Sequence, residues 1–111
     1  MAEGYEPQPL GAKAITATVL SDKITIDGQR CVQYGKVVTV MIRFSVTGSL
    51  DSTESMFGGL PPSPVYTSTC CHKLLGGGNY VLAMNTSGNI RNDWDGISTG
   101  QYMILFSYII A

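Results

Sequence analysis

The stretch from Lys36 to Gly48 constrains the fold more than any other part of the sequence, and it reads KVVTVMIRFSVTG. Apolar residues occupy every second position, while the positions between them include Thr39, Arg43 and Ser45; the apolar series is Val38, Val40, Ile42, Phe44 and Val46. A period of two is the side-chain period of a β-strand, because successive side chains point to opposite faces. The stretch therefore predicts a long strand with one face in the core and the other face half exposed to water.

The rest of the chain also contains strand-like segments, which are shorter. Segments rich in Val, Ile, Thr and Tyr are separated by Gly, Asn and Pro, and no segment keeps a helical period over three turns. Gly35-Lys36 predicts a turn that pairs residues 30–34 with the long strand, and TSGN predicts a second hairpin between residues 79–85 and 90–94. Residues 14–20 and 23–28 are expected to form two more strands, the second ending at Asp27-Gly28.

These runs predict an all-β chain, built as an antiparallel β-sandwich of the jelly-roll kind. Residues 1–12 contain two prolines and two glycines and are expected to be an extended lead-in or linker. Residues 13–111 are expected to form a single β-sandwich domain, which fits the short chain length.

The last apolar run, residues 101–110, is unusual because both of its faces are apolar. A strand of this kind is expected to be buried on both sides, either within the sandwich or against another subunit. Only 14% of the residues are charged, against about 25% in an ordinary soluble domain, so part of the surface is expected to be an interface. The residues proposed for this oligomer interface are Tyr102, Ile104, Phe106, Tyr108 and Leu105.

The segment from Gly58 to Leu75 holds three prolines, two adjacent cysteines and the single histidine. The prolines lack amide hydrogens, so residues 58–64 are expected to be a stiff connector, followed by a strand from Val65. On a strand, Cys70 and Cys71 point to opposite faces, and they cannot bind one ion together with His72. We expect no metal, one cysteine in the core, and reduced thiols.

Several classes of function are disfavoured. Nucleophilic catalysis needs a nucleophile beside an oriented base, and the chain has a single histidine to serve as that base. We therefore expect no enzyme and no cofactor. A net charge of -1 provides no basic field for nucleic acid. The longest apolar run is about ten residues, half of what a membrane-spanning helix needs, and no secretion signal is visible. No membrane insertion is expected.

The hexapeptide RNDWDG is the most promising polar cluster. A saccharide site needs an aromatic face for the sugar ring and planar polar groups for its hydroxyls. The cluster offers both, and the residues proposed for saccharide binding are Trp94, Asp93, Asp95, Asn92 and Arg91. The alternative is that the tryptophan packs at the edge of the sheet while Asp95-Gly96 forms a turn.

The order of the elements resembles the C-terminal domains of tail proteins from phages and prophages of Gram-positive bacteria, which include receptor-binding, tail-fibre and baseplate proteins. Three elements carry the resemblance: the strand entered through YGKVV, the loop GGLPPSP and the turn SGNI. The matching residues are Tyr34, Gly35, Val37, Val38, Val40, Gly59, Leu60, Pro61, Pro64, Ser87, Gly88, Asn89 and Ile90. The chain departs from the family at Ser63, where a glycine-aromatic pair is expected, and in its Cys-Cys-His sequence.

The resemblance implies a homotrimeric head that binds saccharide on the host cell surface and assembles with other tail or baseplate proteins. It also implies a virion protein that is made in the bacterial cytoplasm and released by lysis. Two alternatives stay open: a purely structural virion or baseplate subunit, and a free carbohydrate-binding, lectin-like module.

Overall fold

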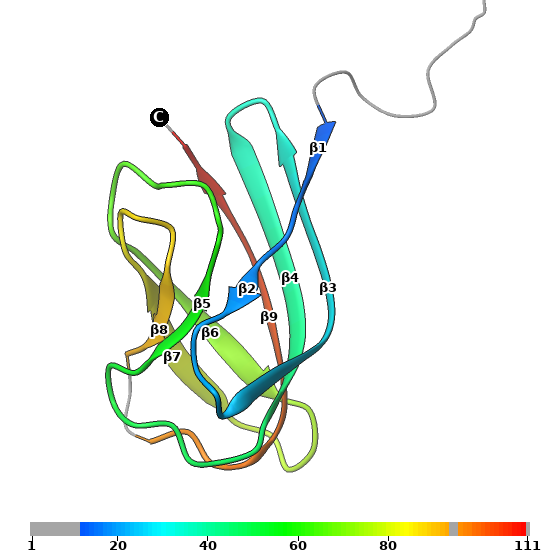
Figure 1. The fold of residues 1–111 in the computed structure, drawn as a ribbon, viewed down its shortest axis with the longest axis vertical. Coiled ribbons are helices and arrows are strands. Elements are labelled where there is room, and N and C mark those ends of the chain that lie inside the picture. Colours follow the sequence, from blue (N-terminus) through cyan, green and yellow to red (C-terminus); the bar gives the residue numbers. More distant parts are fainter. Residues whose placement is uncertain (1–11, 94–95, 111) are drawn as a thin grey trace, which may run out of the picture.

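The computed structural model describes residues 12–93 and 96–110, and in this part of the chain all regular structure is β-strand. Nine strands form a single antiparallel sheet (Figure 1). Their bounds are β1 Ala12–Ile15, β2 Thr18–Val19, β3 Ile24–Tyr34, β4 Val37–Val46, β5 Ser55–Gly58, β6 Thr67–Lys73, β7 Asn79–Met84, β8 Ile90–Asn92 and β9 Gly100–Ile109. The predicted all-β class is confirmed.

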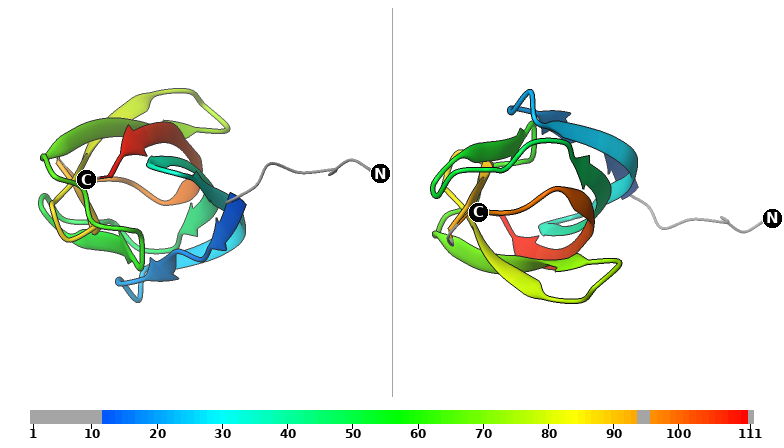
Figure 2. Two further views of the ribbon diagram at one scale, coloured as in Figure 1. Left: turned by 90° about the horizontal axis from the view of Figure 1, so that it is seen from above. Right: turned by 90° about the horizontal axis from the view of Figure 1, so that it is seen from below.

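The sheet curls until its two ends meet, with strand order β1-β3-β4-β9-β6-β7-β8-β5-β2. The first and last strands of this order are neighbours in sequence, because only Thr16 and Ala17 separate β1 from β2. β1 pairs with β3 and β2 pairs with β5, so the N-terminal segment joins both ends of the sheet. The ring of strands is visible along the long axis (Figure 2). One curled sheet thus makes both walls around the core.

The central strand β4 has the predicted pattern. All five residues of its apolar series are buried, and the residues between them are exposed or half-buried. β4 pairs with β3 on one side and with β9 on the other over its whole length. The turn at Gly35, whose φ is 58°, links β3 to β4 as expected. The second hairpin, β7 to β8, is also confirmed.

The expected strand end at Asp27-Gly28 is wrong. β3 continues through these residues to Tyr34, and the pairing with β4 shifts by one residue between Ile26 and Gly28. This extra residue is a β-bulge, which bends a strand and increases its twist. Asp27 is held at the bulge by the Ser45 hydroxyl of β4, which donates to the carboxylate at 2.6 Å. The Asp-Gly pair therefore helps to curl the sheet instead of ending a strand.

Aromatic contacts cross the interior of the ring. The rings of Phe44 on β4 and Phe57 on β5 meet edge-to-face with centroids 5.0 Å apart, although five steps of the strand order separate β4 from β5. Tyr102 on β9 stacks on Phe44 at 5.7 Å and contacts Tyr80 edge-to-face at 5.5 Å. These contacts fill the interior of the curled sheet with side chains and make one continuous core.

Within the single chain β9 is buried on one face only, so the first of the two expected alternatives, in which the sandwich itself buries both faces, is wrong. Tyr102, Ile104 and Tyr108 lie in the interior, and Phe106 is half-buried against the same core. Tyr102, Ile104 and Tyr108 therefore present little side-chain surface to a partner. Leu105 faces outward, with 63% of its surface exposed. Of the five residues proposed for an interface, only Leu105 is well exposed.

The proline-rich connector between β5 and β6 is held in place by two distant parts of the chain. The Tyr108 hydroxyl of β9 donates to the Pro61 carbonyl oxygen at 2.8 Å. The turn between β7 and β8 packs against the connector at Gly88, where an added Cβ would lie 2.2 Å from the Leu60 carbonyl oxygen. Two of the motifs that suggested the phage resemblance thus contact each other. Within the described residues, no helix has the length and apolar character to cross a membrane.

Candidate functional site

The hexapeptide proposed for saccharide binding lies on β8 and just after it. Arg91 and Asn92 belong to β8, and Asp93 follows it, with its amide donating to the Val81 carbonyl oxygen at 3.0 Å. Trp94 and Asp95 lie outside the described residues. β8 pairs with β7 on one side and β5 on the other, and the alternation along it sends neighbouring side chains to opposite faces.

Asn92 faces the interior and is fully buried. Its side-chain amide donates to the Asp51 carbonyl oxygen at 2.9 Å, and its backbone bonds to Glu54 and Thr53, both at 2.9 Å. A side chain in this position ties β8 to the loop that precedes β5. Asn92 is therefore a structural residue, and its side chain is not accessible to a saccharide on the outer surface.

Replacing Asn92 with Ala is expected to lower the free energy of unfolding by about 1–3 kcal/mol, because the fully buried Asn92 side chain loses its hydrogen bond to the Asp51 carbonyl oxygen. Urea denaturation of the two proteins measures the change. Asp93→Asn, at the next and exposed position, is the control and should change stability by no more than about 0.5 kcal/mol. Equal stability of Asn92→Ala and the wild type would contradict this role.

Arg91 points outward from the same strand. Its guanidinium carbon lies 5.5 Å from the ring centroid of Tyr66, a distance typical of a cation–π contact. Its Nη2 atom lies 3.9 Å from the Asp93 carboxylate. Tyr66 is 51% exposed, and the Arg91 and Asp93 side chains are 39% and 40% exposed. We call these three residues the Tyr66 site.

Tyr66 was not among the residues expected at this site. It is the last residue of the connector, immediately before β6, and the neighbouring turn is set by Ser63, whose hydroxyl donates to the Val65 carbonyl oxygen at 2.7 Å. Arg91 lies 25 positions further along the chain, and only the pairing of β6, β7 and β8 brings them together. An exposed aromatic residue just after a proline-rich segment was the available signal.

The Tyr66 site combines an aromatic face, a cation with planar donors and a carboxylate acceptor on an open surface. These groups match what a sugar presents, since the C–H face of a pyranose packs on an aromatic ring and its hydroxyls both donate and accept hydrogen bonds.

The cysteine pair occupies β6 as predicted. Cys71 is fully buried in the core, while Cys70 and His72 face outward. All three cysteines are free thiols. Burial, and to a smaller extent the nearby Cys70, raises the pKa of the Cys71 thiol to about 12. Among the described residues, no three His, Cys, Asp or Glu side chains come together in a way that would hold a metal ion.

A second polar cluster surrounds Glu54 in the loop before β5. Its carboxylate accepts hydrogen bonds from the Ser21 hydroxyl at 2.6 Å, the Asp51 amide at 2.9 Å and the Lys23 ammonium at 3.1 Å. The Ser21 hydrogen bond, followed by the one from Asp51, lowers the pKa of Glu54. All these groups satisfy one another, so the cluster anchors a loop and offers nothing to a ligand.

No protein-family model matches the sequence, and no curated protein matches it significantly. The function must therefore be inferred from the site itself.

Proposed function

We propose that this protein is a saccharide-binding module of a phage or prophage tail, which attaches the virion to the host cell surface as part of a homotrimer. The observation that carries the proposal is the Tyr66 site, where an exposed aromatic ring, a guanidinium and a carboxylate lie together on the outer surface. Sugar-binding surfaces use this combination of an aromatic platform and planar polar groups.

The phage context rests on the resemblance of the strand, loop and turn motifs. The contact between Gly88 and Leu60 supports it, because it gives the GGLPPSP and SGNI motifs a common structural purpose. In this proposal the protein is made in the bacterial cytoplasm, joins other tail or baseplate proteins and leaves the cell by lysis. The bound ligand is a saccharide of the host cell wall.

A purely structural virion subunit is the second candidate. The observation that favours it is the apolar outer side of β9, where Leu105 and Ile109 are 63% and 64% exposed. Such residues serve assembly, and a subunit that only assembles needs no ligand. The third candidate is a free lectin-like module, which binds saccharide at the Tyr66 site and is not part of a virion.

Replacing Tyr66 with Ala is expected to weaken the binding of host cell-wall polysaccharide at least about tenfold, since removing an aromatic anchor of a binding site costs about 2 kcal/mol or more. Isothermal titration calorimetry with purified wall polysaccharide measures the change. Tyr66→Phe keeps the ring and should bind within about twofold of the wild type.

Val65→Ala is the matched control, because Val65 is an exposed neighbour outside the site, at 63% against 51% for Tyr66. It should leave the affinity unchanged. If the Tyr66→Ala variant still binds the polysaccharide, saccharide binding does not depend on the Tyr66 site. A wild-type protein that assembles but binds no polysaccharide would instead favour the structural subunit.

A further inference from the structure

The outer face of β6 and β9 brings together three side chains with metal-binding atoms. Cys71 and Ile104 are paired across these strands, and both are fully buried. The next pair, His72 and Met103, therefore lies on the outer face, where His72 is exposed and Met103 is half-buried. Cys70 is half-buried on the same face, two positions before His72. We call Cys70, His72 and Met103 the β6–β9 cluster.

The register of the two strands sets the spacing within the cluster. Directly opposite residues of an antiparallel pair, such as His72 and Met103, have Cβ atoms about 4.5–5.5 Å apart. Cys70 and His72 are alternate residues of one strand, which places them about 7 Å apart. Cys70 lies diagonally across from Met103, at about 7–8 Å, a separation that long side chains span. The three side chains are therefore close enough to share one metal ion.

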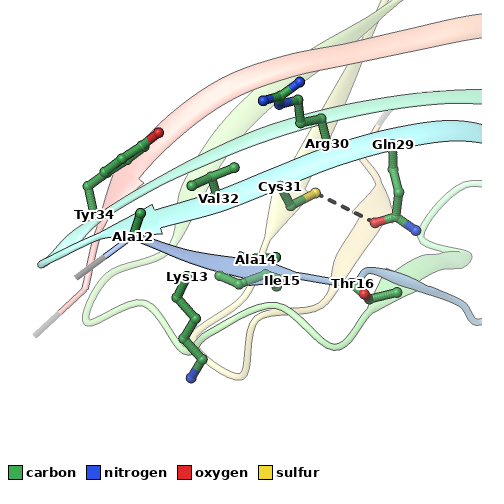
Figure 3. Close-up of a pocket in the computed structure, with 10 residues that line it drawn as sticks. All are labelled: Ala12, Lys13, Ala14, Ile15, Thr16, Gln29, Arg30, Cys31, Val32 and Tyr34. Atoms are coloured by element: carbon green, nitrogen blue, oxygen red, sulfur yellow. Dashed lines mark hydrogen bonds between the residues drawn. The ribbon is translucent and has the colours of Figure 1, made fainter. Parts of the chain in front are cut away.

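The other two thiols of the chain are not available to an ion on this surface. Cys71 points into the core, and Cys31 is 3% exposed, with its Sγ atom 3.7 Å from the Gln29 Oε1 atom (Figure 3). Burial raises the pKa of both thiols, which disfavours the thiolate that binds a metal. Of the three cysteines, Cys70 is the one that can serve as a ligand.

We propose that the β6–β9 cluster binds one Cu(I) ion through the Cys70 thiolate, the His72 imidazole and the Met103 thioether. Thiolate and thioether sulfur are soft ligands that select Cu(I), and imidazole also suits copper. Binding releases the thiol proton to solvent, because the thiolate is the ligand. The expectation of no metal took only cysteine and histidine as ligands. Met103 comes beside His72 only through the pairing of β6 with β9.

Anaerobic titration of the full chain with Cu(I), in competition with the chelator bathocuproine disulfonate, measures stoichiometry and affinity. The wild type should bind one Cu(I) ion. Cys70→Ser and Met103→Leu should each weaken binding at least about tenfold, since even the hydrogen-bond partners of metal ligands contribute about 10–100-fold to affinity. Met103→Leu nearly conserves volume, so the melting temperature of this variant without metal should stay close to that of the wild type.

Met41→Leu is the matched control, because Met41 is also a half-buried methionine at an outward position, on β4. Its replacement should leave the affinity for Cu(I) unchanged. Alkylation by iodoacetamide, counted by mass spectrometry, gives a second measurement. In the folded wild type one thiol should react, bound Cu(I) should protect it, and Cys70→Ser should remove the reaction.

Equal affinities of the wild type and Cys70→Ser for Cu(I) would overturn the proposal. If Met103→Leu binds as tightly as the wild type, or if Met41→Leu weakens binding as much as Met103→Leu, the thioether of Met103 is not a ligand and the three-residue cluster is wrong. The site is independent of saccharide binding, so Tyr66→Ala should bind Cu(I) like the wild type.

Discussion

Gly88→Ala is expected to lower the free energy of unfolding by about 3–5 kcal/mol, the largest effect of any single substitution considered for this protein. Gly88 has a φ of 85°, which strains any residue with a side chain. An added Cβ would also lie 2.2 Å from the Leu60 carbonyl oxygen and 3.0 Å from the Pro61 carbonyl oxygen. Both neighbours are backbone atoms, so neither can move aside cheaply.

Urea denaturation measures this change, and Gly76→Ala separates its two causes. Gly76 has nearly the same φ, 90°, but an added Cβ would meet nothing within 4 Å. Its replacement should cost only the backbone strain, about 1–2 kcal/mol. If the two variants lose equal stability, the contact between the turn and the connector is not what makes Gly88 necessary.

Raising the pH above 9 is expected to destabilise the protein steeply. Burial raises the pKa of Cys71 from 9.0 to about 12 and that of Tyr108 from 10.0 to about 12. The folded state therefore keeps protons that the unfolded state releases. The stability that these groups contribute is complete below their unfolded pKa values and is lost as the pH rises toward 12. Each group contributes a slope of about 1.4 kcal/mol per pH unit within its window.

Urea denaturation at pH 8 to 12 measures the slope. Cys71→Ala and Tyr108→Phe each remove one of the two titrations, so each variant should lose stability less steeply than the wild type between pH 10 and 12. The double variant should have the flattest profile. A wild-type slope in both single variants would show that these two groups are not the cause of the alkaline loss.

The hairpins show which structural features the local sequence pattern can predict. The alternation along β4 and the turn chemistry at Gly35 are properties of neighbouring residues, and both predictions are confirmed. Asp27-Gly28 has the same local chemistry as a turn, yet it forms a bulge, because β4 continues beside it and offers partners to the whole of β3. A partner strand can override a turn signal, and the signal itself does not reveal this.

The candidate site was only partly predictable for the same reason. RNDWDG pointed to β8, but the alternation along β8 places Asn92 inside and Arg91 outside. That outcome depends on which face of β8 meets the core. Tyr66 was missed because its contact with Arg91 depends on two strand pairings and not on sequence distance.

The sequence by itself determined the all-β class, the long core strand, the Gly35 hairpin and the opposite directions of Cys70 and Cys71. Each of these follows from the period of two and from turn residues, which act within a few positions. The tertiary structure alone decided that β1 and β2 close the sheet, that β9 buries one apolar face and exposes the other, and that Tyr66 meets Arg91. These features depend on the order and register of strands distant in sequence. A run with two apolar faces, such as β9, fits either orientation until its partner strands select one.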